Sequence, residues 1–579
     1  MSAKRFFTLD NTFFTLLVIG IFIGGYAHWF MEPGKAKRYI WLAFICCLTM
    51  GAMTLPRFTA WIKDKLKRRK VASYHQGDIA AALALFGESN ISEIRALTRE
   101  PNPAKWTNQR ECNLRWEGEP LLRLKWLHMD HAELAGELEV PPLSALERLS
   151  ITNNPKLNVL KGLENLPKLN GLWISDTGLT DVNLSGNPDL TSLLAYNTKL
   201  KTLDLSANHR LNHLQLSQTQ SAELDLTSLP HLKTLCLRRT ELKDLCLENH
   251  STLRLLDVDG HALKRVRLGS LPSLGSIILN CPALEDFDLS AAPQVKQLAI
   301  SEGRLDKLSL NGLPNLEGVT LLRMPLKELD FNQCGKLETI CLERLALAGL
   351  NLKAAQSLKK LELQKMALSS VDLSRNLKLE SLSLDDLPVK NINVSSNKAL
   401  TTLKINKMAL NYVDLSHNLK LELLSLDDLP VKNINVSANK ALTTLKINKL
   451  PLTALNVSAN KALKYLTVSE TPLNSLNVSA NKNLERLDVS DTPLASLQLD
   501  HNQHLLCLFA SGTSLPELNL TKNKSLQQLA IDGSALKQVL ISRKLQWLYT
   551  DQQTPEIFAP RFPGVEFLCW KGACSGLTE

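Results

Sequence analysis

From about residue 143 onward, aliphatic residues return at a fixed spacing that divides the chain into short, equal segments. One segment begins at Leu463 and has aliphatic residues again at its fourth and sixth positions, Leu466 and Val468. A second segment begins at Leu473 and repeats this one-four-six spacing, and Leu484 then restarts the pattern. The period is therefore 21 residues, and two apolar half-segments fill each period.

Polar residues keep the same phase as the aliphatic ones. Steps of 21 from Asn183 to Leu540 meet 18 positions, of which 13 are Asp or Asn. Four residues later, the same walk meets asparagine at many steps: Asn187, Asn208, Asn376, Asn397, Asn418, Asn439, Asn460, Asn481, Asn502 and Asn523. A buried amide can pair with backbone donors and acceptors at the corner of a coil. We therefore predict a structural ladder of stacked asparagines, with its longest run from Asn376 to Asn523.

The middle of the repeat region departs from this pattern. Between about residues 225 and 355 the corner position holds other residues: Leu229, His250, Leu271, Ala292, Leu313, Cys334 and Ala355. Either packing replaces hydrogen bonding at these corners, or the stretch is a distinct sub-block.

A longer repeat overlies the short one. Residues 376–407 and 418–449 are the same string except at Ser381/Leu423 and Ser396/Ala438. Their offset of 42 residues equals two periods. This indicates the duplication of a block of two coils, which an array of units that contact mainly their neighbours tolerates.

The Leu-x-x-Leu-x-Val/Ile/Leu-x-x-Asn/Thr pattern resembles that of leucine-rich repeats. The Leu-Asn-Val-Ser-Ala-Asn-Lys phrase resembles the bacterial, internalin-like type, in which two half-repeats alternate. The resemblance covers about residues 140–550. It implies a curved leucine-rich repeat solenoid with a parallel β-sheet on its concave face and short strands or turns on its convex face. Both halves compete for the sheet, and we expect the half beginning at Leu463 to form it, because the Thr-Pro-Leu that follows is typical of a turn.

Residues 1–70 predict a two-helix transmembrane anchor. Two runs free of Asp, Glu, Lys and Arg, at about residues 13–31 and 39–55, have the length of short membrane helices. A cleaved signal peptide is the competing interpretation of the first run. Lys and Arg concentrate outside the two runs, so the positive-inside rule places both termini in the cytoplasm. The localisation predicted is a bacterial inner membrane, which the chain crosses more than once.

Two further segments flank the repeats. Residues 71–142 break the period and predict an N-terminal cap or linker, with a helix over Asp78–Phe86 and an apolar-rich segment over Leu121–Leu127. The solenoid is expected over 143–550, and its spacing slips by two residues near Arg543. Residues 551–579 supply the bulky side chains expected of a C-terminal cap.

The distribution of charge argues against nucleic acid as a partner. The net charge is +10, but residues 1–70 contain 12 Lys and Arg against 3 Asp and Glu. The remaining chain contains 55 against 54 and is nearly neutral. Binding to DNA or RNA depends on a concentration of positive charge that this body lacks.

No motif in the chain carries a recognisable chemistry. Cys569 and Cys574 are the closest cysteine pair outside the predicted membrane segments, but their spacing is poor for zinc, and a cytoplasmic location favours free thiols; whether they pair is left open. The pairs His128/His131 and His501/His504 are expected to be ordinary surface or core histidines. We expect no catalytic, cofactor-binding or metal-binding residues, and no enzyme activity.

What remains is a surface that could bind a protein. The side chains between the strand leucines form the candidate concave binding face: Thr402, Lys404, Asn406, Asp427, Thr444, Lys446, Asn448, Tyr465, Thr467, Arg486 and Asp488. Lys404 and Lys446 alternate with Asp385 and Asp427 on neighbouring coils. The competing interpretation is a solvated sheet face without a ligand.

These features favour a membrane-anchored scaffold or adaptor that binds proteins on the cytoplasmic side of a bacterial inner membrane. Two other functions stay open. One is a secreted effector inserted in a host membrane and binding host proteins, and the other is an outward-facing adhesin or receptor. The ligand, the pathway, the source organism and the oligomeric state do not follow from the sequence.

Overall fold

The computed structural model describes residues 73–74, 76–87, 113–117, 121–218, 224–541, 545–549 and 567–568. The chain divides into two compact units, residues 1–243 with 257–260, and residues 244–256 with 261–579. The predicted membrane helices, Cys569 and Cys574 lie outside the described residues, as does most of the predicted C-terminal cap. Within the described ranges, no helix combines the length and the apolar character needed to cross a membrane.

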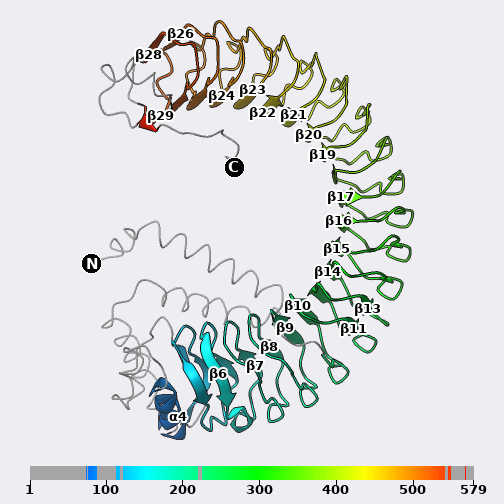
Figure 1. Ribbon diagram of the computed structural model, residues 1–579, viewed down its shortest axis with the longest axis vertical. Coiled ribbons are helices and arrows are strands. Elements are labelled where there is room, and N and C mark those ends of the chain that lie inside the picture. The colour runs from blue at the N-terminus through cyan, green and yellow to red at the C-terminus, as the bar shows by residue number, and fades with distance from the viewer. Residues whose placement is uncertain are drawn as a thin grey trace. The chain divides into compact units, whose positions relative to one another are not determined.

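The first unit joins a small cap to a parallel sheet (Figure 1). The sheet order is β3–β5–β7–β8–β9–β10, all parallel, while β2 pairs antiparallel with β3. Two strands, β4 and β6, form a separate parallel pair, and β1 pairs with β3. The elements are β1 (Ser73–Tyr74), α4 (Gln76–Gly87), β2 (Asn113–Glu117), β3 (Leu121–His128), β4 (Ala135–Glu139), β5 (Arg148–Ser150), β6 (Lys156–Lys161), the 3-10 helix η4 (Leu163–Asn165), β7 (Gly171–Trp173), β8 (Ser192–Leu194), β9 (His213–Ser217) and β10 (Thr234–Arg238).

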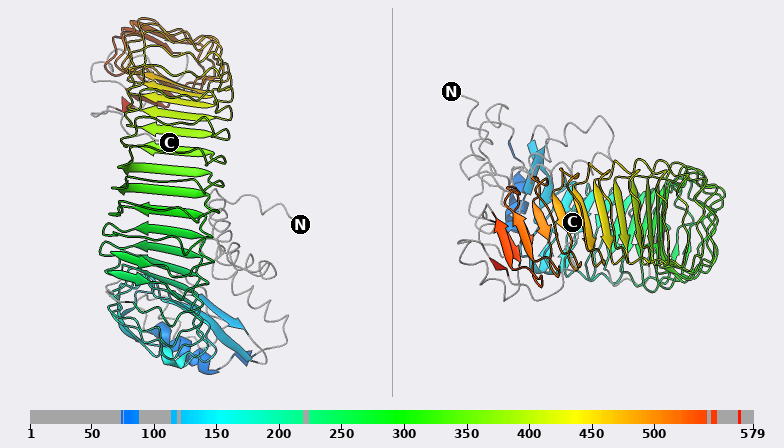
Figure 2. Two further views of the ribbon diagram at one scale, coloured as in Figure 1. Left: turned by 90° about the vertical axis from the view of Figure 1, so that its right-hand side faces the viewer. Right: turned by 90° about the horizontal axis from the view of Figure 1, so that it is seen from above.

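The second unit repeats one coil many times, and its strands lie side by side in one parallel sheet (Figure 2). Short pairs, β11–β13 and β26–β28, lie apart from that sheet, and β12 (Leu255–Asp259) crosses the division between the units. The other strands are β11 (Asp244–Cys246), β13 (Arg265–Arg267), β14 (Ser276–Asn280), β15 (Gln297–Ser301), β16 (Gly318–Met324), β17 (Thr339–Leu345), β18 (Lys360–Gln364), β19 (Ser381–Asp385), β20 (Thr402–Asn406), β21 (Leu423–Asp427), β22 (Thr444–Asn448), β23 (Tyr465–Ser469), β24 (Arg486–Asp488), β25 (Cys507–Phe509), β26 (Glu517–Leu520), β27 (Gln528–Ala530), β28 (Gln538–Ile541), β29 (Trp547–Tyr549) and β30 (Phe567–Leu568).

The half-repeat that begins at Leu463 forms the sheet, which confirms the predicted choice between the two halves. Strand β23 begins two residues after Leu463. Along each strand, side chains alternate between the two faces of the sheet. In β22, Leu445 and Ile447 are buried in the core, whereas Thr444, Lys446 and Asn448 are partly or fully exposed. The stacked aliphatic side chains form one continuous core.

The asparagine at each corner bonds to the preceding coil. The Nδ2 atom of Asn439 donates to the carbonyl oxygen of Leu415 at 3.0 Å and to that of Asn418 at 2.9 Å. Every asparagine from Asn376 to Asn523 at this step makes the same two bonds, and each is at most 2% exposed. Their Oδ1 atoms are buried and accept no hydrogen bond within the described residues. The predicted pairing with backbone N–H donors is therefore not observed. The side-chain amides only donate, to backbone carbonyl oxygens.

Corners without asparagine keep the same turn, except at Leu271, whose N–H donates to the carbonyl of Ala291. The N–H of Ala292 donates to the carbonyl of Leu289 at 3.0 Å, as that of Asn439 does to Val436. Leu271, Ala292, Leu313, Cys334 and Ala355 are fully buried at these corners. Packing thus replaces the amide in the middle coils, which supports the first of the two explanations.

The 13 Asp and Asn residues that recur in steps of 21 from Asn183 stabilise a second turn in the coils that contain them. In the steps described, their Oδ1 atom accepts from the backbone N–H two residues later, for example from Ser374 to Asp372 at 3.0 Å and from Ser437 to Asn435 at 3.0 Å. Asp and Asn commonly stabilise turns in this way. The hydroxyl and the N–H of Ser374 lower the pKa of Asp372. The sequence analysis recognised the spacing of these residues but did not predict that their side chains accept backbone hydrogen bonds in a turn.

One residue at or near the end of each strand from β15 to β24 adopts a left-handed backbone conformation. In ten successive coils of the second unit it is not glycine and has a φ of 48–64°. For a residue with a side chain, this conformation costs roughly 1 kcal/mol relative to glycine. Two later coils use Gly512 and Gly533 at the same step. The ten residues are Glu302, Arg323, Arg344, Lys365, Asp386, Lys407, Asp428, Lys449, Glu470 and Asp491.

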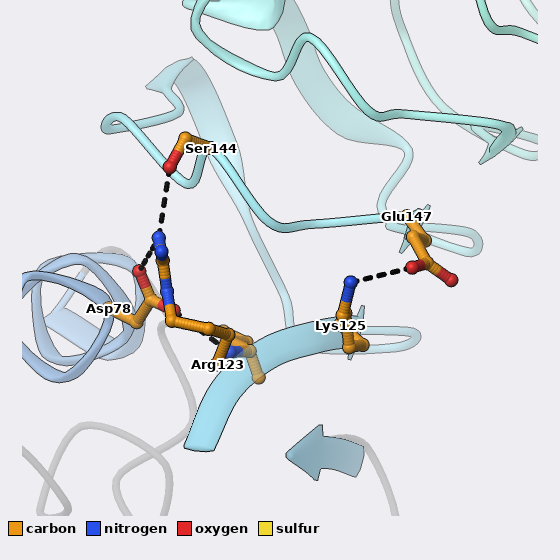
Figure 3. Close-up of polar contacts among 6 residues, drawn as sticks. Asp78, Arg123, Lys125, Ser144 and Glu147 are labelled. Atoms are coloured by element: carbon orange, nitrogen blue, oxygen red, sulfur yellow. Dashed lines mark hydrogen bonds and ion pairs between the residues drawn. The ribbon is translucent and has the colours of Figure 1, made fainter. Parts of the chain in front are cut away.

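The N-terminal cap is tied to the sheet through a buried carboxylate (Figure 3). Asp78 of α4 is 1% exposed and accepts from Nε of Arg123 at 2.8 Å and from the N–H of Leu124 at 2.9 Å. Arg123 also donates to the Ser144 hydroxyl at 2.9 Å. The bond to Asp78 raises the pKa of Arg123. Strands β1 and β3, which pair in parallel, both lie inside the segment predicted as a cap.

The last described coil is shorter than the others. Gln528 of β27 pairs with Trp547 of β29, a step of 19 residues, in agreement with the predicted slip near Arg543. The final strand, β30, pairs parallel with β29.

Candidate protein-binding face

All eleven predicted face residues lie on strands β20–β24, on the side of the sheet away from the core. Lys404, Lys446 and Tyr465 are exposed, and the other eight are partly exposed. The register aligns them in columns across the strands, since Lys404 pairs with Ser425, and Ser425 with Lys446. We refer to these eleven residues as the sheet face.

One column that runs through the sheet face, extended by the neighbouring Asp385 and Ser469, is already paired within the chain. The side-chain nitrogen of Asn406 donates to Oδ1 of Asp385, and Asn448 donates to Asp427 in the same way. The Ser469 hydroxyl then donates to Oδ1 of Asn448 at 3.0 Å. These bonds fix the side chains and occupy one oxygen of each carboxylate.

Lys404 and Lys446 differ from this column. Both are exposed, and neither forms an ion pair with any residue that the structure describes. They lie two strands apart, which corresponds to about 10 Å. The centre of the sheet face therefore presents two available cations among hydroxyl groups.

The later strands of the sheet face add aromatic groups. The Arg486 guanidinium lies 4.5 Å from the centre of the Phe509 ring, within cation–π range. The Tyr465 hydroxyl donates to Glu485 at 3.2 Å, and Tyr465 is 43% exposed.

The first unit has an aromatic cluster that the sequence did not predict. The Arg148 guanidinium lies 4.4 Å from the ring centre of Trp126 and 5.9 Å from that of Trp173. His128 meets Trp173 edge-on at 5.7 Å. Burial lowers the pKa of His128, with Asp130 opposing, so the imidazole is neutral at pH 7. Three coils with steps of 22 and 23 residues build this cluster, and these steps lie outside the regular period.

Two observations on the described residues bear on metal binding and thiol chemistry. No group of three or more His, Cys, Asp or Glu side chains converges among them. Burial raises the pKa of Cys236, Cys334 and Cys341 to about 11, so these thiols are protonated at neutral pH. None of the six described cysteines forms a disulfide.

Two hollows lie in the first unit, outside the sheet face. The larger, of about 630 Å³, is lined by residues such as Asp181, Lys201 and Asp204 on the turns. The other, of about 490 Å³, is lined by residues including His131 and Asp176. Both are open to solvent and are lined by polar and apolar groups together.

The coils have the leucine-rich repeat fold. The structure of YopM from Yersinia enterocolitica is similar, with a TM-score of 0.54 and 22% identity over 74% of this chain and 91% of that chain. The functional domain of InlJ from Listeria monocytogenes has a TM-score of 0.44 and 21% identity, over 65% of this chain and 75% of its own. The leucine-rich repeat ectodomain of the Arabidopsis thaliana receptor kinase GASSHO1/SCHENGEN3 has a TM-score of 0.44 and 17% identity, over 82% and 76%.

A scan against models of protein families finds no match, and neither does a search of curated proteins. The likeness to YopM, at low identity, shows the fold alone, and that fold is the predicted leucine-rich repeat solenoid.

Proposed function

We propose that this protein is a scaffold or adaptor that binds a protein partner through the sheet face, at the cytoplasmic side of a bacterial inner membrane. The observation that carries the proposal is the ordered polar face of β20–β24, where hydrogen bonds hold Asp385 and Asp427 while Lys404 and Lys446 stay available. A preorganised face loses little side-chain entropy on binding.

The chemistry of the face favours an acidic partner segment. Asp385 and Asp427 already accept hydrogen bonds, so the two lysines are the charges that remain to be neutralised. In a polyproline II segment, which is extended and has three residues per turn, side chains three apart lie on one face about 9 Å apart, close to the spacing of Lys404 and Lys446. An extended segment with two carboxylates at this spacing, running across the strands, fits the sheet face.

Replacing both lysines of the face tests this proposal. We expect the full chain with Lys404→Glu and Lys446→Glu to lose at least about tenfold in affinity for its partners, since attraction becomes repulsion. Affinity capture from cells that express the full chain, with quantification of each captured protein, measures the loss.

The matched control is Lys440→Glu with Lys482→Glu. These exposed lysines are also two coils apart, but they lie on the turns instead of the sheet. Partners retained by the control and lost by the face variant support the proposal. Partners captured equally by both variants would contradict it.

Membrane attachment rests on the two apolar runs at 13–31 and 39–55 and on their basic flanks. Fusion of alkaline phosphatase, which is active only outside the cytoplasm, tests the proposed topology. We expect activity for a fusion after residue 36 and none for a fusion after residue 579, because both termini are placed in the cytoplasm. Activity at residue 579 would instead favour an outward-facing adhesin or receptor.

A further inference from the structure

A row of charges follows the edge of the second-unit sheet where the strands end. It consists of eight residues at steps of 21 from Arg344 to Asp491, all exposed and all in the left-handed conformation described above. We call it the charged row. Glycine would fit this backbone with less strain, as at Gly512 and Gly533. The ion pairs that the row forms within the described chain, Lys449 with Glu470 and Arg344 with Glu343, are long (3.6 Å) and exposed, so they add little to the fold.

The signs of the charged row reverse about its middle. Its order is plus, plus, minus, plus, then minus, plus, minus, minus. When the row is aligned with its own reversed order, every residue lies opposite a residue of the opposite charge. The inner two matches join Lys407 with Asp428, and Asp386 with Lys449.

The outer matches follow the same rule. Lys365 meets Glu470, and Arg344 meets Asp491. Beyond the row, the next step joins Arg323 with Gly512, so no like charges meet there either. A row of this kind is complementary to its own reversed copy.

A strip of small apolar residues accompanies the charged row. Two positions after each charge stands Ala or Pro, from Ala346 to Pro493, and all eight are exposed. Such side chains are short and lose little entropy on contact. They allow another backbone to approach closely along the whole row.

A two-fold axis normal to the sheet brings two such edges together. The axis would pass between the ends of β20 and β21, and it reverses both the strand direction and the order of the coils. Because the two edges share one coil spacing, every match along the row is made at once. Rotation about this axis does not turn the sheet over. The sheet faces of the two copies therefore point to the same side of the dimer and stay exposed to solvent.

The opposite edge of the sheet lacks this complementarity. The exposed corner tips that precede the same strands contain Arg375, Lys398, Lys440, Lys461 and Lys482, and no acidic residue occurs in tips 375–378, 396–399, 417–420, 438–441, 459–462 or 480–483. Contact of two copies through these tips would bring cation against cation. The chain therefore has one edge suited to a second copy and one edge that opposes it.

We propose that the charged row and the adjoining Ala/Pro strip form the interface of a homodimer, with a second copy of this chain placed edge to edge about the two-fold axis. Closed two-fold contacts are the commonest symmetry of soluble assemblies, and they place each residue pair in the interface twice. The contact depends on exposed ion pairs, so it weakens as salt screens them. The proposal concerns the edge of the sheet and does not depend on the function proposed for the sheet face.

Charge reversal at the axis tests the dimer. For the full chain, purified in a neutral detergent, sedimentation equilibrium at low ionic strength is expected to show a monomer–dimer equilibrium. Lys407→Asp alone, or Asp428→Lys alone, should raise the dissociation constant roughly 10- to 100-fold, since each creates two like-charge contacts. The double variant Lys407→Asp with Asp428→Lys restores opposite charges and should restore the affinity to within about threefold.

Three further results complete the test. Lys440→Asp, on the opposite edge, should leave the dissociation constant unchanged, and 0.5 M NaCl should weaken the wild-type dimer at least about tenfold. Circular dichroism of each variant confirms that its fold is retained. A wild-type chain that stays monomeric at all concentrations would overturn the proposal, as would single reversals without effect or a double variant that fails to recover.

Discussion

Replacing Asn439 with alanine is expected to lower the free energy of unfolding of the second unit by about 2–4 kcal/mol. The Asn439 amide supplies hydrogen bonds to two buried carbonyls, those of Leu415 and Asn418. Alanine removes both donors and leaves a small cavity, while it also removes the unpaired Oδ1 atom. The loss of two buried bonds outweighs the removal of one unpaired acceptor.

Urea denaturation measures this loss, and hydrogen exchange locates it. In a stacked array each coil contacts mainly its neighbours, so exchange should rise first in the coils on either side of Asn439. The control is Lys440→Ala, an exposed neighbour in the same turn, which should change stability by less than about 0.5 kcal/mol. Equal stability of the two variants would mean that the amide contributes nothing to the stack.

Replacing Asp78 with alanine is expected to release helix α4 from the sheet, with a local destabilisation of about 3–5 kcal/mol. The carboxylate is buried and accepts from the backbone of Leu124, which is fully buried, and from Arg123. Without Asp78, the N–H of Leu124 has lost its acceptor and the cation its partner (Figure 3).

Limited proteolysis within α4, compared with wild type, is the measurement for this variant. Asp78→Asn keeps an acceptor for Leu124 but loses the charge, so its effect should be intermediate. The control is Glu147→Ala, which breaks the pair with Lys125 at 2.7 Å in the same view. That pair is more exposed, and its loss should cost less than about 1 kcal/mol. Cleavage of α4 at the wild-type rate in Asp78→Ala would refute the assignment.

The sequence predicted most of the repeat architecture because the core is built from it directly. Leu463, Leu466 and Val468 return every 21 residues, and this period predicts a repeat solenoid, whose type was inferred from the resemblance to leucine-rich repeats. The choice of half-repeat for the sheet also proved correct, and the strands carry the sheet face at the predicted positions. The asparagine at each corner was recognised from its spacing, although it pairs with carbonyls only.

Other features were hidden for physical reasons. Arg344 and Lys365 have no preference for left-handed backbone, so nothing in their identity indicates their conformation. Trp126, Arg148 and Trp173 come together from coils of irregular length, which the 21-residue walk does not reach. Asp78 and Arg123 are 45 residues apart and belong to a segment without a repeat.

The duplicated block creates a hazard during folding. Because residues 376–407 and 418–449 differ at only two positions, either copy can stack on the coil that precedes the first. If the second copy stacks in place of the first, 42 residues are left out of the solenoid as a loop, yet the contacts at the junction are nearly native. Such near-degenerate arrangements are typical kinetic traps of repeat proteins. Emergence from the ribosome one coil at a time, with the first copy in place before the second exists, removes the competition.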